Sequence, residues 1–306
     1  MTKKDGLTVF LCYFMWGFEP LCWQLLDDVD TLTVLGVRIV FAAVFSLLLL
    51  ALQGRLNEVG TVLKTGSIMK FLVPASVFLL ADWTVYIIVV NSGHILDAGI
   101  GYYINPLILF LAGLIIYREK CTKRHIIALS FAFLGVLVST LAFGSFPYIS
   151  LIIAFNWAVY AVIKKNVKLD GVLSIAVESL ILTVPALVFL TAFRSHELSV
   201  LNAQQWLLLI GSGVLTALPL FLYSHCVSNL PLIIMCFAQY LSPTFNLICG
   251  FITGESFTES QLTSFAFFIL AIIIFSAGEI KSIKEKNNGK STKSPKDWLD
   301  ENIRCY

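Results

Sequence analysis

The fold is decided by a pattern that occurs twice: residues 101–119 read GYYINPLILFLAGLIIYRE, and residues 237–255 read FAQYLSPTFNLICGFITGE. Three residues of the first stretch recur 137 positions later, namely Tyr103 as Tyr240, Pro106 as Pro243 and Gly113 as Gly250. Glu119 recurs as Glu255, one residue short of that spacing. Two more pairs have similar spacings, Trp16 with Trp157 at 141 and Tyr86 with Tyr223 at 137. Together these matches indicate an internal duplication.

Both repeated stretches belong to a series of apolar segments that are long enough to cross a membrane. A bilayer core of about 30 Å needs about 20 mostly apolar residues in a helix. The 306-residue chain has ten such segments, at residues 7–26, 32–52, 71–90, 98–117, 125–142, 148–163, 174–193, 205–225, 232–251 and 261–279. Only 13% of the residues are charged, whereas a soluble domain has about 25%. The sequence therefore predicts an all-α integral membrane protein with ten transmembrane helices.

The duplicated unit contains five predicted helices, and this odd number has a topological consequence. Two such units joined head to tail cross the membrane in opposite directions, which makes an inverted-topology repeat. Many secondary transporters have this architecture, with a central site between the two halves. We expect a cytoplasmic N-terminus at residues 1–6, a first five-helix repeat at 7–142, a second at 143–279 and a basic cytoplasmic tail at 280–306.

Lysine and arginine are distributed very unevenly between the two predicted faces. Of the 21 basic residues, 19 lie on the side of the N-terminus, Arg194 alone lies on the opposite side, and Arg38 lies within a span. Because short basic loops stay in the cytoplasm, we expect a multi-pass protein of the cell membrane with both termini cytoplasmic. The basic tail is typical of a contact with anionic lipid headgroups, so no nucleic-acid partner is predicted.

Three charged residues lie deep inside the first three predicted membrane spans, at a similar depth. At 1.5 Å per residue, Glu19, Arg38 and Asp82 lie about 10 to 12 Å from the outer ends of the first three helices. A charge at a helix centre costs about 2.5–3.5 kcal/mol on insertion scales, so the three should face one another or water. We interpret them as part of a polar cavity that recruits an anion or links transport to protons. The alternative is a structural salt-bridge triad that lines no cavity.

Further candidates for the cavity wall are polar or aromatic residues in the same spans. They are Trp16, Trp83, Tyr102, Asn105 and Gln239. Each has a structural alternative, since tryptophan is frequent at membrane interfaces and amides form hydrogen bonds between helices.

Pro106 and Pro243 occupy matching places in the two halves and are candidate helix breaks. A proline removes one helical hydrogen bond, and the freed carbonyl is satisfied by neighbouring groups or by cavity water. The two prolines could therefore interrupt helices beside a solute site, or each could form a kink needed only for packing.

Several motifs, in order along the chain, resemble one transporter family. They are YFMWGFEP at 13–20, Arg38, GYYINP at 101–106, FGSFPYISLIIAFNWAVYAVIKK at 143–165, Glu178 before Pro185, and QYLSPT at 239–244. The chain thereby resembles RarD-type proteins of the EamA group in the drug/metabolite transporter (DMT) superfamily. The resemblance covers residues from about 7 to 280 and implies two inverted five-helix halves and the activity of a permease or exporter. The chain departs from the family pattern at Glu19 and Asp82, which implies an altered polar lining of the cavity.

The leading functional prediction is a secondary transporter for small metabolites or drugs. No P-loop is present to couple ATP, and no GxSxG, HExxH or GxGD motif indicates an intramembrane enzyme, so no catalytic residue is predicted. No spacing of His or Cys indicates a metal site, and no cofactor is expected. The predicted partners are a small-molecule substrate and the lipid bilayer, and the sequence leaves a homodimer open. A membrane receptor or scaffold without transport is the alternative, with an intramembrane enzyme the less favoured one.

Overall fold

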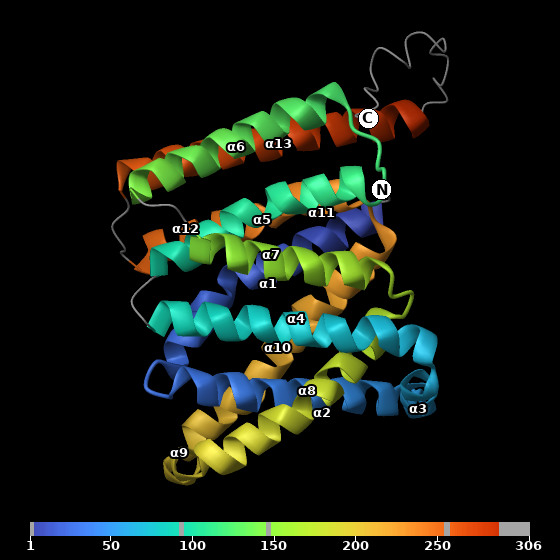
Figure 1. The fold of residues 1–306 in the computed structure, drawn as a ribbon, viewed down its shortest axis with the longest axis vertical. Helices are drawn as coiled ribbons and strands as arrows, with labels where there is room; N and C mark the ends of the chain where they lie inside the picture. Colours follow the sequence, from blue (N-terminus) through green and yellow to red (C-terminus); the bar gives the residue numbers. More distant parts are fainter. Residues whose placement is uncertain (1–2, 92–94, 145–147, 254–257, 288–306) are drawn as a thin grey trace.

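The computed structural model describes residues 3–91, 95–144, 148–253 and 258–287. These residues form a bundle of helices (Figure 1). The first half contains α1 (Lys3–Trp23), η1 (Gln24–Leu26), α2 (Thr31–Leu52), α3 (Leu56–Lys64), α4 (Gly66–Asn91), α5 (Ile95–Ile115) and α6 (Lys123–Phe143). The second half contains α7 (Tyr148–Lys165), α8 (Gly171–Phe193), α9 (Ser195–Val200), α10 (Ala203–Asn229), α11 (Leu232–Gln239), α12 (Leu241–Thr253) and α13 (Glu259–Asn287).

The helices agree with the ten predicted spans. Within the described residues, nine segments are long and apolar enough to cross a membrane, and α5 contributes a shorter apolar segment at Ile100–Ile115. The structure adds two short helices, α3 and α9, in connecting segments that the sequence analysis did not assign. It also divides the ninth predicted span into α11 and α12, which meet at Tyr240.

The packing of the helices repeats itself when the two halves are exchanged. Two pairs of matching helices contact each other directly, α2 with α8 and α6 with α13. The other contacts occur as matched pairs: α5 with α7 corresponds to α12 with α1, and α4 with α7 corresponds to α10 with α1. Likewise, the contact of α2 with α10 corresponds to that of α8 with α4. The fold is therefore a duplicated one, with each half packed against the other.

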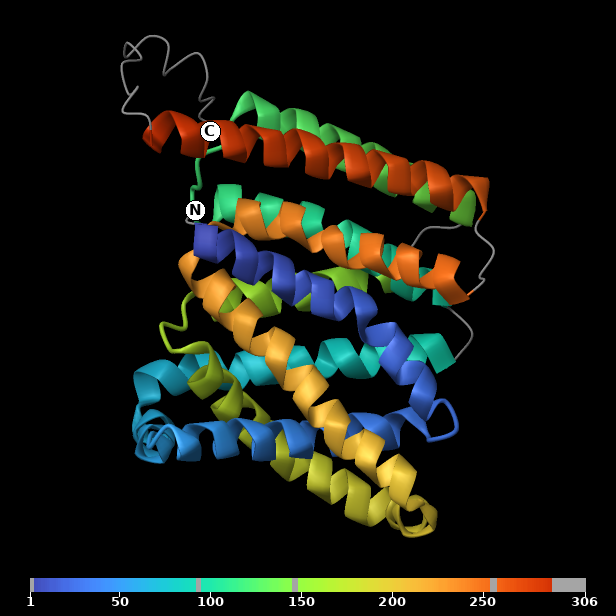
Figure 2. The ribbon, with the colours of Figure 1, turned by 180° about the vertical axis from the view of Figure 1, so that it is seen from behind.

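The two halves run in opposite directions through the bundle. Seen from both sides, α1 and the matching helix α7 run antiparallel to each other (Figures 1 and 2). The first turn of α1 and the last turn of α13 lie at the same end of the bundle (Figures 1 and 2). The predicted inverted repeat is confirmed, and both ends of the described helical region lie on one side of it.

Matching aspartates begin the second helix of each half. The carboxylate of Asp30 accepts a hydrogen bond from the backbone N–H of Thr33, and Asp170 accepts one from Leu173. Aspartate is a favoured N-cap because its oxygen satisfies one of the free N–H groups of the first turn. The two caps are 140 residues apart, so α2 and α8 begin at equivalent places and can be compared residue by residue.

The two repeated prolines have different effects on their helices. Pro243 is the third residue of α12, and its ring would clash with the carbonyl of Gln239, four residues earlier, in a continuous helix. Gln239 is the last residue of α11, so the chain is interrupted where this clash would arise. At Pro106 the structure differs from the expected break, because α5 continues from Ile95 to Ile115.

Candidate functional site

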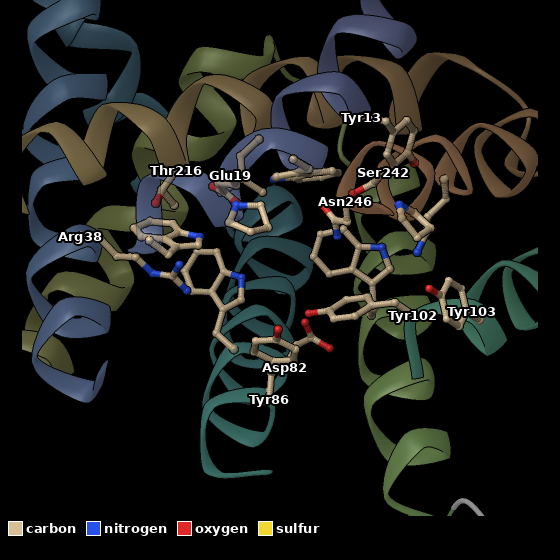
Figure 3. Close-up of a pocket in the computed structure, with 18 residues that line it drawn as sticks. Tyr13, Glu19, Arg38, Asp82, Tyr86, Tyr102, Tyr103, Thr216, Ser242 and Asn246 are labelled. Atoms are coloured by element: carbon tan, nitrogen blue, oxygen red, sulfur yellow. The ribbon is translucent and has the colours of Figure 1, made fainter. Parts of the chain in front are cut away.

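The bundle encloses a cavity of about 290 Å³ whose wall combines charged and aromatic side chains. It is lined by Tyr13, Trp16, Glu19, Pro20, Trp23, Arg38, Asp82, Trp83, Tyr86, Tyr102, Tyr103, Trp157, Thr216, Leu220, Gln239, Ser242, Pro243 and Asn246 (Figure 3). Both halves of the chain contribute to this wall. Its three charged residues come from the end of α1, the first half of α2 and the second half of α4, which lie away from the end where the chain begins.

Arg38 supplies the positive charge of the cavity and is held between two indole rings. Its guanidinium carbon lies 4.6 Å from the centre of the Trp83 ring and 5.2 Å from that of Trp23. Cation–π contacts of this kind stabilise a partly desolvated guanidinium while leaving its N–H edge able to donate. The Nε of Arg38 is buried and has no hydrogen-bond partner within the described protein. Arg38 is therefore fixed by contacts to its faces, and its edge remains available to an anionic group.

Asp82 supplies a carboxylate that the protein itself does not satisfy. The residue is fully buried, and neither of its oxygens has a hydrogen-bond partner among the described residues. Tyr86 and Tyr102 lie near it, with their ring centres 5.5 Å apart (Figure 3). Because a buried unsatisfied polar group is costly, a hydrogen-bond donor that occupies the cavity would stabilise this carboxylate. This makes Asp82 the position in the wall that most directly points to a ligand.

Glu19 lies in the same cavity, and the three membrane charges are not tied together as a salt-bridge triad. Glu19 acts electrostatically on Arg38, yet none of the ion pairs among the described residues joins two of the three charges. A purely structural triad would require such pairs and no cavity. The geometry instead favours the interpretation in which the three charges face a shared polar space.

Most of the remaining predicted wall residues lie on this cavity, and two do not. Trp16, Trp83, Tyr102, Gln239 and Pro243 line it, whereas Asn105 and Pro106 are not among its lining residues. Asn105 is buried and donates a 2.6 Å hydrogen bond from Nδ2 to the carbonyl of Ala154. This joins α5 to α7 and corresponds to the alternative of an amide bonded between helices.

Several polar wall residues were not predicted from the sequence. Thr216 comes from the middle of α10, and Ser242 and Asn246 come from the first turns of α12. The last two are four residues apart and share one face of α12 beside Pro243, so a search for polar residues within one turn of the repeated prolines could have found them. Thr216 carries no comparable signal, because a lone threonine in an apolar span usually bonds its own helix.

Aromatic residues from matching positions of the two halves meet at one side of the cavity. The rings of Trp16 and Trp157 lie 5.4 Å apart in an edge-to-face arrangement. Both also contact Tyr223, at 5.3 and 5.2 Å. Since Trp16 and Trp157 are repeat partners, the cavity lies at the junction of the two halves.

Comparison with known proteins identifies the family to which this architecture belongs. The family described as "EamA-like transporter family" matches residues 5–141 and 147–277. The chain belongs to the EamA-like transporter family. Each of the two matched segments corresponds to one five-helix half, and the chain is accordingly a multi-pass membrane protein of a transporter family.

Proteins from several bacteria are similar to this chain over most of its length. "Uncharacterized transporter YojE" of Bacillus subtilis is 34% identical over 287 residues, which cover 92% of this chain and 96% of that protein. "Protein RarD" of Escherichia coli is 29% identical, with coverage of 90% and 94%. One solved crystal structure has a TM-score of 0.73 at 13% identity and covers 90% of this chain and 98% of the other, which shows a shared fold.

Proposed function

We propose that this EamA-like protein is a secondary-active transporter that carries small metabolites or drugs through the charged aromatic cavity by alternating access. The family and its transporter-named relatives support a membrane transporter. The observation that carries the finer proposal is the buried carboxylate of Asp82, a cavity-lining residue whose two oxygens have no hydrogen-bond partner among the described residues. A solute or water molecule in the cavity would satisfy them.

The chemistry of the wall favours a solute with a planar body and charged or strongly polar groups. Arg38 offers its guanidinium edge to an anionic group, and guanidinium binds carboxylate and phosphate well because both oxygens can accept together. Asp82 offers a carboxylate to a cationic or donating group. The indole and phenol rings supply flat apolar surfaces of the kind that line small-molecule sites.

The inverted repeat supports the alternating-access part of the proposal. Two halves with the same fold and opposite directions can exchange conformations, so that a central site opens first to one side and then to the other. The cavity is displaced toward the end of the bundle opposite the start of α1. With both termini in the cytoplasm of the cell, as the distribution of basic residues predicts, this structure corresponds to an outward-facing arrangement.

Solute uptake by purified protein in proteoliposomes tests the proposal. Amino acids, nucleobases and amphiphilic drugs should be screened with and without an imposed pH gradient, and with empty liposomes as the control. We expect at least one solute to accumulate in a protein-dependent manner, and a proton-coupled mechanism requires the rate to change with the gradient. Failure of every class to cross the membrane, with protein that is folded and correctly inserted, would contradict the proposal.

A further inference from the structure

A second charged cluster lies closer than the cavity to the end of the bundle where the chain begins. Lys164 in the last turn of α7 forms an ion pair with Glu178 of α8, and both side chains are buried. The Nζ of Lys164 also donates to the Oγ of Ser174 at 2.6 Å. The hydroxyl of Tyr160 donates to Glu178 Oε2 at 3.2 Å. We refer to Tyr160, Lys164, Ser174 and Glu178 as the inner cluster.

The burial of the two charged residues of the inner cluster differs from what the sequence predicts. In the sequence, Lys164 directly follows the predicted span 148–163, and Glu178 lies near the beginning of the span 174–193, so each is expected near the membrane interface, where it would be solvated. In the structure both are shielded completely from solvent. A buried ion pair is weak support for stability, since desolvation offsets much of the attraction, so its place in the membrane domain needs another explanation.

The inner cluster is continuous with the cavity along one face of α7. Trp157, Tyr160 and Lys164 follow each other at helical spacing, with Trp157 in the cavity wall and Lys164 in the cluster. The rings of Tyr160 and Tyr223 stack at 6.0 Å, and Tyr223 also contacts Trp157 of the cavity wall. Tyr223 is fully buried, and its hydroxyl has no partner among the described residues. A continuous series of aromatic contacts therefore joins the cavity wall at Trp157 to the buried ion pair.

The internal repeat relates this ion pair to a contact in the wall of the cavity. Counted from the matching caps Asp30 and Asp170, Arg38 and Glu178 occupy the same position of α2 and α8, 140 residues apart. Trp23 and Lys164 are 141 residues apart, the same spacing as Trp16 and Trp157. Trp23 contacts Arg38, and Lys164 contacts Glu178. The two contacts are thus equivalent in the two halves. Trp23 and Arg38 line the cavity, whereas Lys164 and Glu178 are fully buried.

We infer that the inner cluster is the second charged site of the transport pathway, closed in this structure by the pairing of Lys164 with Glu178. When the halves exchange conformations, the cluster takes the open arrangement that the cavity has here, and Glu178 then lines the solute site as Arg38 lines the cavity in this structure. A cationic group of the solute then replaces Lys164 at the carboxylate. The part of this inference that concerns a solute rests on the proposed function. The closure of the inner cluster can be tested in the absence of any solute.

Cysteine accessibility from the two sides of the membrane tests the inference. In a background with the native cysteines replaced, one reporter is Ser242→Cys in the cavity and the other is Ala161→Cys, a buried position of α7 beside the inner cluster. Each is labelled with a membrane-impermeant methanethiosulfonate reagent, applied in turn to right-side-out and inside-out vesicles. In the parent chain we expect the reagent to reach Ser242→Cys from the outer side and Ala161→Cys from neither side.

Weakening the closure should change the two accessibilities in opposite directions. Glu178→Gln should raise the labelling rate of Ala161→Cys from the inner side at least about threefold and lower that of Ser242→Cys from the outer side by a similar factor, as expected for a shifted two-state equilibrium. The double variant Lys164→Gln with Glu178→Gln should act alike, and it leaves no unpaired buried charge to impair folding. Lys64→Gln, at an exposed lysine of α3 outside the cavity and the inner cluster, is the matched control and should change neither rate.

The outcomes separate the inference from a structural role and from the proposed function. Unchanged labelling of Ala161→Cys in both charge variants would overturn the inference, as would an equal rise at both reporters, which indicates loosened packing. Since the assay contains no solute, reciprocal labelling would stand even if no solute were transported. Absence of transport with reciprocal labelling would therefore contradict the proposed function alone.

Discussion

The hydroxyl of Tyr240 donates a 3.1 Å hydrogen bond to the backbone carbonyl of Tyr103, and these two tyrosines occupy matching positions of the two halves. Both rings also stack on Phe268, with centre distances of 4.8 and 4.9 Å. The bond reaches α5 three residues before Pro106, where the proline deprives the helix of one donor. Repeat partners thus join the halves directly, beside a repeated proline.

Removal of this hydroxyl should weaken the junction while leaving its packing intact. Tyr240→Phe keeps the ring on Phe268 and loses the donor to the Tyr103 carbonyl. We expect a loss of about 1 kcal/mol in the free energy of unfolding, seen as a thermal midpoint lower by about 2–4 °C in detergent. Tyr148→Phe, at an exposed tyrosine, is the control and should leave the midpoint unchanged. Equal midpoints for the two variants would show that the hydrogen bond does not stabilise the junction.

The contact between α2 and α10 should be sensitive to a single added methyl group. A Cβ at Gly213 would lie 2.5 Å from the backbone carbon of Phe41 and 2.7 Å from the nitrogen of Ala42. Because backbone atoms cannot move aside cheaply, Gly213→Ala should cost about 1–3 kcal/mol. A Cβ at Gly211, in the same helix, would have no neighbouring atom within 4 Å, so Gly211→Ala should be neutral or slightly stabilising. Thermal unfolding of both variants decides, and a Gly213→Ala chain as stable as the parent would refute the close approach.

Glu119 should stabilise the junction between the halves through the start of α11. Its carboxylate accepts hydrogen bonds from the backbone N–H groups of Leu232 and Ile233, at 2.7 and 2.9 Å, and lies 3.4 Å from Lys165. Loss of such a cap costs about 0.5–2 kcal/mol, so Glu119→Ala should lower the thermal midpoint. Glu259→Ala, in the exposed first turn of α13, should not. If both substitutions had the same small effect, the capping role would be excluded.

The orientation in the membrane gives a prediction that does not depend on any solute. A reporter that is active only in the cytoplasm should work when fused after Lys70, Lys123 or Lys168. It should fail when fused after Asp30 or Asn91, because the basic residues place these positions on the outer side. Reporter activity relative to the amount of fusion protein is the measurement. A working reporter after Asn91 would contradict the orientation, and with it the outward-facing interpretation.

The sequence could predict the bundle because its signals are local or periodic. Apolar length located the helices, and the recurrence of Tyr103 and Pro106 as Tyr240 and Pro243 located the two halves. It could not distinguish the effects of the two prolines. Whether a proline interrupts a helix depends on which groups receive the freed carbonyls, and these groups come from other parts of the chain.

The candidate site was predictable where the cost of burial is large and uncertain where it is small. Charges within apolar spans pointed to Glu19, Arg38 and Asp82, since each must find polar surroundings. Asn105 could be satisfied equally well by a cavity or by a helix carbonyl, and the structure shows the carbonyl of Ala154. The pairing of Lys164 with Glu178 depends on how α7 and α8 approach each other, which no local pattern records.

The most direct test of the account is solute uptake by Arg38→Ala, normalised to the amount of folded protein in the membrane. If Arg38 acts in the cavity, this variant should lose about tenfold or more in normalised uptake, since the anion-binding group is gone and two carboxylates remain without a countercharge. Asp82→Asn should partly restore an Arg38→Ala chain, and Arg55→Ala, at a partly exposed arginine, should be unaffected. A purely structural role predicts less folded protein and unchanged uptake per molecule. Unchanged normalised uptake in Arg38→Ala would therefore contradict the account.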